Sequence, residues 1–221
     1  MAAAAGCGRR YDALLLDFDG TLTDSLPLYT ATMQQLVTEF GLRPLPDGGL
    51  EAMRALGTRE LIAVLGLRWW RIPAATRRMR ELVALRRGEL RLFDGIAPLL
   101  QRLHAEGVQL QLVTSNARDT VETVLGPLRG CFVQLHCGVP LLGKRRALAR
   151  ALRGSGTAAA RVLSVGDELR DAEASRALGL DFAAVSWGVG LPERLQAATA
   201  LPLLRHPGEL AMLVLGAAAP R

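Results

Sequence analysis

Short apolar runs alternate with segments of helical spacing through most of this 221-residue chain. The runs at 13–16, 110–113, 131–135 and 162–165 have the length and composition of buried strands. Each is followed by polar residues and then by a helical pattern, which favours a parallel sheet covered by helices. We therefore predict an α/β fold with a Rossmann-like parallel sheet. One irregularity is the alternation of Gln and Leu over residues 109–112, because a doubly covered parallel strand is usually more uniformly apolar.

The pattern changes between residues 25 and 92, where helical spacing continues without a strand. Apolar positions from Tyr29 to Phe40 predict one helix, which Gly41 ends. Pro73 suits the first turn of another helix. We predict an all-helical cap over 25–92, inserted into a core made of 11–24 and 93–221, with hinges near 23–24 and 93–95. Residues 1–10 are expected to be a disordered tail.

Two carboxylates follow the first predicted strand. Asp17 and Asp19 are two residues apart, so they leave the strand end on roughly the same side, and Gly20 lets the chain turn away. Two neighbouring acids repel, which raises the pKa of one of them unless a cation neutralises the pair. Such a pair suits a divalent metal, or a nucleophile beside a general acid.

Three further segments place reactive side chains after predicted strands. Ser115 or Asn116 is expected to cap a helix, and a capped helix start is a ready phosphate site. Lys144 is the only lysine among 27 lysines and arginines, and it begins a predicted helix. A cation is unfavourable at a helix N-terminus unless an anion lies close to it. Asp167 and Asp171 flank the first turn of a predicted helix and suit a hard cation.

In open α/β sheets, ligands bind beyond the carboxyl ends of the strands, so these residues are expected to converge there. They supply a nucleophile, a proton donor, a phosphate cap, a cation and metal carboxylates. Phosphoryl transfer requires these components, because it depends on positioning and charge neutralisation.

With these residues in these positions, the chain resembles the phosphatases of the haloacid dehalogenase superfamily, in the branch that includes phosphoglycolate phosphatases. The motif DxDGTLxDS matches 17–25, a Thr/Ser at a strand end matches 114–116, the motif lysine matches Lys144, and GDxxxD matches 166–171. The four motifs occur in order, and the resemblance covers nearly the whole chain after residue 10. It implies that the segment 25–92 is the helical cap of that family.

The resemblance also implies roles for the matched residues. Asp17 attacks phosphorus and forms an aspartyl-phosphate, while Asp19 protonates the leaving alcohol and then activates the hydrolytic water. Ser115 holds a phosphoryl oxygen with help from the Asn116 N–H, and Lys144 offsets the charge on the phosphoryl group and on Asp17.

The implied cofactor is Mg²⁺. The family pattern assigns it to Asp17, the backbone carbonyl of Asp19 and Asp167. Asp171 either binds the metal, directly or through water, or orients Lys144.

The expected substrate is a small phosphorylated metabolite, with 2-phosphoglycolate favoured. Gly57 and Arg59 lie where the family often places its specificity loop, and Arg59 suits a substrate carboxylate, although a solvated arginine at a helix start is an equal alternative. Pyrophosphate, sugar phosphates and nucleotides remain open as substrates, and a mutase is disfavoured. The resemblance also argues against two activities: relatives that cleave phosphonates need a lysine in the cap, which 25–92 lacks, and dehalogenase relatives lack the second aspartate of the first motif, which is present here as Asp19. The other alternative is a non-catalytic phosphate-binding regulatory module.

Composition limits the other possibilities. Half of the residues are apolar, no apolar run reaches transmembrane length, and the three cysteines have no metal spacing. We therefore expect a cytoplasmic protein with no membrane partner, as a monomer or homodimer. The net charge of +6 suits small anionic substrates. A basic run is expected on one cap helix and could attract nucleic acid; it consists of Arg77, Arg78, Arg80, Arg86, Arg87 and Arg91. Nucleic acid is nevertheless not expected as a partner, because the basic residues are dispersed along the chain and no nucleic-acid motif appears.

Overall fold

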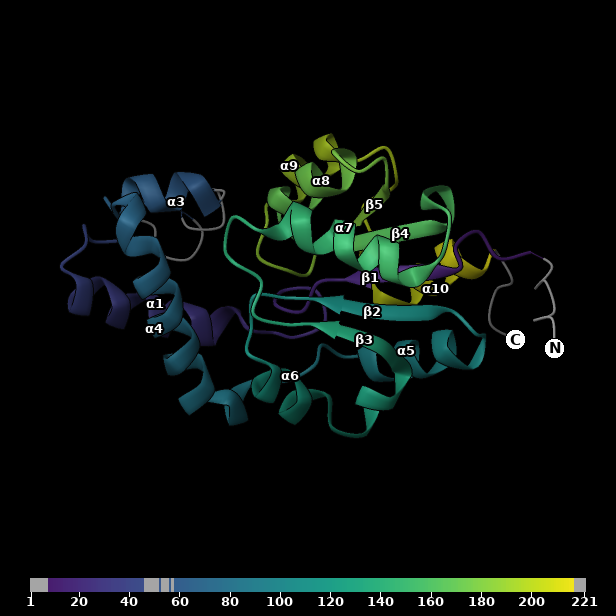
Figure 1. The fold of residues 1–221 in the computed structure, drawn as a ribbon, viewed down its shortest axis with the longest axis horizontal. Coiled ribbons are helices and arrows are strands. Elements are labelled where there is room, and N and C mark those ends of the chain that lie inside the picture. Colours follow the sequence, from purple (N-terminus) through teal and green to yellow (C-terminus); the bar gives the residue numbers. More distant parts are fainter. Residues whose placement is uncertain (1–7, 46–51, 53–55, 57, 217–221) are drawn as a thin grey trace.

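In the computed structural model, five parallel strands form one sheet in the order β3-β2-β1-β4-β5 (Figure 1). The structure describes residues 8–45, 52, 56 and 58–216. The strands are β1 (Ala13–Leu16), β2 (Gln109–Val113), β3 (Phe132–His136), β4 (Val162–Gly166) and β5 (Asp181–Ala184). The four apolar runs of the sequence thus form strands, which confirms the predicted fold class.

Helices cover both faces of this sheet. They are α5 (Ile96–Ala105), α6 (Arg118–Leu125), α7 (Lys144–Ser155), α8 (Leu169–Arg176), α9 (Pro192–Ala198) and α10 (Pro207–Leu215). Short 3₁₀ turns lie at Gly126–Cys131 and Ala159–Arg161. In β1, Leu14 and Leu16 pack in the cluster that includes α5, α6 and α10, whereas Ala13 and Leu15 pack in the cluster that includes α7 and α8. Successive side chains of a strand point to opposite faces, so β1 is buried on both.

The remaining helices form a separate group beyond the carboxyl ends of the strands (Figure 1). They are α1 (Leu26–Phe40), α3 (Thr58–Val64) and α4 (Ile72–Leu85), with 3₁₀ turns at Trp69–Arg71 and Arg87–Glu89. Gly41 ends α1 in a left-handed conformation, and a proline lies in the first turn of α4, both as the sequence predicts. Leu28 of α1 packs against Val83 of α4, so the two long helices share a small core.

Two chain segments that lie side by side connect this helical group to the sheet. Thr23 and Leu92 form an antiparallel bridge. The Asp24 N–H donates to the Arg91 carbonyl at 2.9 Å, and the Phe93 N–H donates to the Leu22 carbonyl at 3.0 Å. The two connecting segments, where hinges are expected, are therefore hydrogen-bonded to each other, and both leave the core at the same point.

A hydrogen-bonded side chain fills the central polar position of the alternation over 109–112: Gln111 is buried, with its Oε1 3.0 Å from His136 Nε2 of β3. The predicted helix cap is wrong. Neither Ser115 nor Asn116 caps α6, because the helix begins one residue later, after Ala117 and without a side-chain cap. Two of the expected tail residues contact the core: Arg9 pairs with Asp12 at 2.7 Å, and the Arg10 N–H donates to the Val214 carbonyl at 2.8 Å.

No helix in the described part of the chain is both long enough and apolar enough to cross a membrane.

Candidate active site

The end of β1 places Asp17 in the interior. Its backbone N–H donates to the Val165 carbonyl at 3.0 Å, and the Phe18 N–H donates to its Oδ1 at 2.8 Å. Its other oxygen, Oδ2, is buried and has no hydrogen-bond partner among the described residues. A buried carboxylate oxygen without a partner is costly unless a ligand or a reaction uses it.

Lys144 lies against this carboxylate. Its Nζ is 2.9 Å from Asp17 Oδ1 and 2.9 Å from Asp171 Oδ1, and it donates to the Val113 carbonyl at 3.0 Å. The side chain is 8 % exposed, so the ammonium group has left water and is bound by these partners instead. Burial opposes the charge on Lys144, but Asp17 and Asp171 outweigh it and raise the Lys144 pKa. The only lysine of the chain is therefore a fixed cation at the strand ends.

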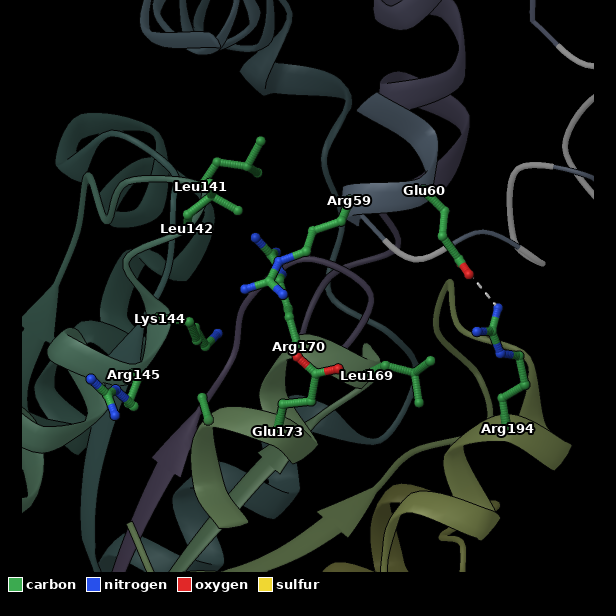
Figure 2. Close-up of a pocket in the computed structure, with 11 residues that line it drawn as sticks. Arg59, Glu60, Leu141, Leu142, Lys144, Arg145, Leu169, Arg170, Glu173 and Arg194 are labelled. Carbon is green, nitrogen blue, oxygen red and sulfur yellow. Dashed lines mark hydrogen bonds and ion pairs between the residues drawn. The ribbon is translucent and has the colours of Figure 1, made fainter. Parts of the chain in front are cut away.

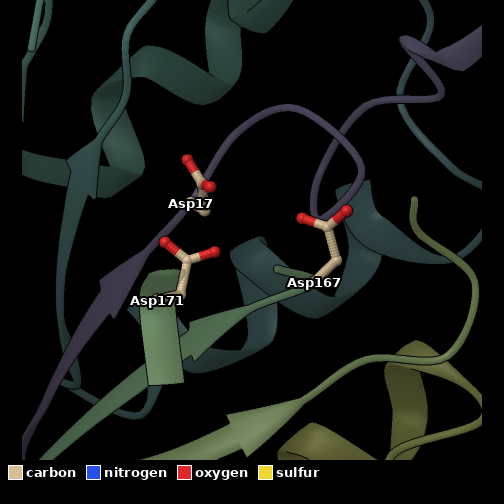
Figure 3. A group of neighbouring side chains, drawn as sticks. All are labelled: Asp17, Asp167 and Asp171. Atoms are coloured by element: carbon tan, nitrogen blue, oxygen red, sulfur yellow. The ribbon is translucent and has the colours of Figure 1, made fainter. Parts of the chain in front are cut away.

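Asp17, Asp167 and Asp171 offer carboxylate oxygens that all lie within 4.8 Å of one another (Figure 3). All three side chains are buried. Burial raises the pKa of Asp171 to about 6, although Lys144 opposes that change, and burial with the Glu168 and Asp17 charges raises the pKa of Asp167 well above its usual value. This cluster has the oxygen donors of a Mg²⁺ site, and a divalent cation would relieve its repulsion.

Two glycines leave room for the Asp167 side chain. A Cβ on Gly20, whose φ is +68°, would lie 2.0 Å from Asp167 Oδ2. A Cβ on Gly188 would lie 2.3 Å from Asp167 Cβ. The Asp167 carboxylate also accepts hydrogen bonds from Thr21 Oγ1 at 3.0 Å and from the Val189 N–H at 2.7 Å. The turn after Asp19 and the loop after β5 thus fix this carboxylate in place.

Asp19 is held by two side chains from different parts of the molecule. Asn116 Nδ2 lies 2.9 and 2.8 Å from its two oxygens, and the Tyr29 hydroxyl donates to Oδ2 at 3.2 Å. Burial and the Asp17 charge raise the pKa of Asp19 to about 7, even though both donors favour the carboxylate. A carboxyl group with this pKa can exchange a proton near neutral pH.

Ser115 is half-buried and lines a cavity of about 230 Å³ together with Asp19 and Tyr29. The Asn116 N–H, which the family pattern directs at phosphate, donates instead to Thr114 Oγ1 at 3.0 Å. In this arrangement the Asn116 side chain binds Asp19, and Ser115 lines the cavity.

A family model named haloacid dehalogenase-like hydrolase matches residues 14–185, most of the chain and all four motifs. The chain belongs to this family. The resemblance drawn from the motifs is therefore confirmed, and the protein is a hydrolase of the haloacid dehalogenase type.

Curated relatives of this hydrolase carry different names. A phosphoglycolate phosphatase of Synechococcus elongatus is 35% identical over 204 residues, which cover 91% of this chain and 96% of that protein. The tyrosine-protein kinase PtkA of Mycobacterium tuberculosis is 30% identical over 197 residues, which cover 85% of this chain and 66% of that protein. The crystal structure of a putative phosphoglycolate phosphatase from Lactobacillus plantarum superposes with a TM-score of 0.78 at 22% identity, covering 92% of this chain and 99% of that one.

The helical group of this hydrolase contacts the site through its own side chains. Arg80 of α4 donates from Nε to the Ser115 carbonyl at 2.7 Å and from Nη2 to the Val139 carbonyl at 2.9 Å. Arg59, on the first turn of α3, is exposed and lines a second cavity beside Lys144. Gly57 lies outside the described residues.

Sequence reasoning missed three residues of this site. Tyr29 was assigned only to the apolar face of its helix, Arg80 only to a basic run, and Arg170 to no role at all. Two of them have a signal in the sequence: Tyr29 lies one helical turn beyond the motif that ends at Ser25, and Arg170 lies inside the GDxxxD motif at 166–171. Arg80 has no comparable signal, since tertiary packing decides where its long side chain ends.

Proposed function

We propose that this hydrolase is a Mg²⁺-dependent phosphomonoester hydrolase, with 2-phosphoglycolate as the favoured substrate. The observation that carries the proposal is the Asp17 carboxylate. One of its oxygens is bound by Lys144, and the other is buried without a partner among the described residues. Asp19, two residues later, has a pKa suited to proton transfer.

In this proposal Mg²⁺ would be held by the carboxylates of Asp17 and Asp167 and by the backbone carbonyl of Asp19. The close carboxylates and the unpartnered Asp17 Oδ2 fit such an ion. The bound ion would orient the phosphate and screen its repulsion from Asp17. Asp171 acts differently, because its Oδ1 contacts Lys144 and its Oδ2 accepts the Glu168 N–H at 3.3 Å. We assign it to the orientation of Lys144.

Asp17 is the proposed nucleophile. A carboxylate that attacks phosphorus forms an acyl phosphate and splits hydrolysis into two steps. Lys144 holds the carboxylate in one position and balances the negative charge that gathers between it and the phosphoryl group. The Ser115 hydroxyl is the proposed ligand of a phosphoryl oxygen.

Asp19 is the proposed general acid and base. Asn116 and Tyr29 hold both of its oxygens, so the carboxyl group has one orientation. It gives a proton to the leaving alcohol in the first step. In the second step it takes a proton from the water that attacks the acyl phosphate.

We further propose that residues 25–92 act as a cap over this site. The paired connections at Thr23 and Leu92 and the Arg80 contacts to the core support the proposal. A cap of this kind excludes water from the reacting groups. The relative from Synechococcus elongatus supports phosphoglycolate as the substrate.

The test is phosphate release by the purified protein and by Asp17→Asn across a panel of phosphorylated metabolites, with Mg²⁺ and with a chelator. We expect turnover that is highest on 2-phosphoglycolate, that chelation abolishes and that Asp17→Asn lacks. Folded, Mg²⁺-loaded protein that releases phosphate from no ester in the panel would contradict the proposal.

A further inference from the structure

A cavity of about 550 Å³ lies beside the catalytic carboxylates, between the core and the helical group (Figure 2). Arg59 reaches it from the first turn of α3, and Arg170 reaches it from the first turn of α8. Lys144 forms its inner edge. The volume is within the range of sites that hold small molecules, about 300 to 1,000 Å³.

The lining of this cavity carries an excess of positive charge. Five of its residues are basic and two are acidic: Arg59, Lys144, Arg145, Arg170, Arg194, Glu60 and Glu173. Glu60 of α3 and Arg194 of α9 form an ion pair at 3.3 Å, which also joins the cap to the core. Lys144 is bound to Asp17 and Asp171. Arg170 is paired with Glu168 at 2.7 Å, so Arg59 and Arg145 are the lining cations without an ion pair among the described residues.

Arg170 has unused hydrogen-bonding capacity. Its Nη2 donates to Glu168 Oε1 at 2.7 Å, and its side chain is 21 % exposed. Its Nε is buried and has no hydrogen-bond partner among the described residues. A guanidinium has five N–H donors in a rigid fork, and a buried donor without a partner costs free energy. Arg170 thus has one donor without a partner among the described residues, and the exposed part of its side chain lines the cavity.

The charge on Arg170 is secure. Burial opposes it, but the carboxylates of Glu168, Asp171 and Asp17 outweigh burial and raise the Arg170 pKa further above its usual value. Arg170 also lines the 230 Å³ cavity that contains Asp19 and Ser115, and it shares the larger cavity with Lys144, which contacts Asp17. A group bound to Arg170 can therefore belong to the same small molecule as the reacting phosphate.

We propose that Arg170 of the core and Arg59 of the cap form a subsite for a second anionic group of the substrate, a carboxylate attached close to the phosphoester. The inference rests on the proposed function and goes beyond it by assigning Arg170 as the specificity residue on the core side. Two arginines that face one cavity repel each other, and an anion between them removes that repulsion. Guanidinium groups bind carboxylates through paired, charge-assisted hydrogen bonds.

The experiment compares two substrates that differ only in the second anion. In 2-hydroxyethyl phosphate a neutral CH₂OH replaces the carboxylate of 2-phosphoglycolate. We expect wild type to favour 2-phosphoglycolate in kcat/KM by about tenfold or more, as for a lost charge-assisted contact. Arg170→Met and Arg59→Met should each lower kcat/KM for 2-phosphoglycolate by about tenfold or more. The same variants should lower kcat/KM for 2-hydroxyethyl phosphate by less than about threefold.

Two variants separate a specific contact from general charge. Arg170→Lys keeps the charge and loses the fork, so it recovers only part of the preference. Arg145→Met removes an exposed cation from the same cavity, and it should change the preference by less than about twofold. An equal loss of preference in Arg145→Met would mean general attraction and would overturn the subsite.

The remaining outcomes distinguish the subsite from the proposed function. If Arg170→Met lowers kcat/KM equally for both substrates, Arg170 only balances the neighbouring carboxylates and the subsite is overturned. If wild type hydrolyses both substrates with equal efficiency, the phosphatase stands and the subsite fails. If folded wild type releases phosphate from neither, the proposed function itself fails, and the inference fails with it. Thermal unfolding of each variant shows whether it is folded.

Discussion

The Tyr29 hydroxyl, on the first turn of cap helix α1, donates a hydrogen bond of 3.2 Å to Oδ2 of Asp19. The same hydroxyl lies 3.4 Å from Asn116 Oδ1, and Tyr29 is half-buried. Loss of water around the hydroxyl and the Asp19 charge raise the Tyr29 pKa well above its usual value. It therefore stays protonated and remains a donor. Helix α1 of the proposed cap thus holds the proposed general acid through one side chain.

Tyr29→Phe should lower kcat more than it raises KM, because the lost hydrogen bond orients a catalytic group and does not bind substrate. A bond to a charged group is worth enough to reduce kcat by about tenfold. The expected loss applies to 2-phosphoglycolate and is smaller for p-nitrophenyl phosphate, whose leaving group needs no proton. Thr38→Val, which removes an exposed hydroxyl from the same helix, is the control. Equal losses on both substrates would contradict the orienting role.

The pH dependence should follow Asp19. Its pKa is raised to about 7, so the protonated acid that the first step needs is present below that pH and is lost above it. We expect kcat for 2-phosphoglycolate to fall as pH rises through about 7 to 8, and kcat for p-nitrophenyl phosphate to stay nearly level. Tyr29→Phe removes a donor that favours the carboxylate and should move this limb to higher pH. A limb of the same shape for both substrates would argue against Asp19 as the acid.

Mg²⁺ should stabilise the fold more strongly at high pH. The pKa values of Asp167 and Asp171 are raised in the folded state, so folding is favoured when both carboxyl groups are protonated. The free energy of unfolding of the metal-free protein should therefore fall as the pH rises through about 6 and above. Mg²⁺ binds only the ionised cluster. We expect the increase in Tm with Mg²⁺ to be larger at pH 8 than at pH 5.

Asp167→Asn provides the matched variant for that measurement. It removes one buried charge from the cluster, so the metal-free Tm should rise at pH 8 and the increase with Mg²⁺ should shrink. An unchanged increase with Mg²⁺ in this variant would mean that the ion binds elsewhere.

Arg80 should hold the cap against the core. Its two hydrogen bonds to the Ser115 and Val139 carbonyls are part-buried, whereas Arg77 on the same helix has a side chain that is 76 % exposed and only a 3.7 Å contact to Glu81. Arg80→Met should raise KM several-fold and speed hydrogen exchange in α4, and Arg77→Met should do neither. Unchanged exchange in α4 of Arg80→Met would contradict this role.

Four of the five strands in the described part of the chain were predicted from short apolar runs, and both faces of β1 are buried among leucines and alanines. The fifth strand, β5, was not among those runs. The proximity of the proposed catalytic residues was predictable because they lie in recognisable motifs that follow strands. Gln111 was not, because its pairing with His136 joins β2 to β3 and has no local signal. The prediction that Ser115 or Asn116 caps α6 was wrong for a related reason: the Asn116 side chain contacts Asp19, which is 97 positions away in the sequence.

The basic run of the proposed cap also differs from its prediction. From sequence it was one helix from Arg77 to Arg91, but α4 ends at Leu85 and the later arginines lie beyond it. Arg78 pairs with Glu39 at 2.7 Å, and Arg80 contacts the core. Charge alone did not distinguish these roles, because each depends on which neighbour the folded chain supplies.

The central claim is that Asp17 becomes covalently phosphorylated. The most direct measurement is to quench the enzyme during turnover of 2-phosphoglycolate with Mg²⁺, reduce it with borohydride and sequence the peptides by mass spectrometry. Borohydride converts an acyl phosphate of aspartate to homoserine. The account predicts homoserine at position 17, dependent on substrate and Mg²⁺. Turnover without any modification at position 17, or with modification at another carboxylate, would contradict it.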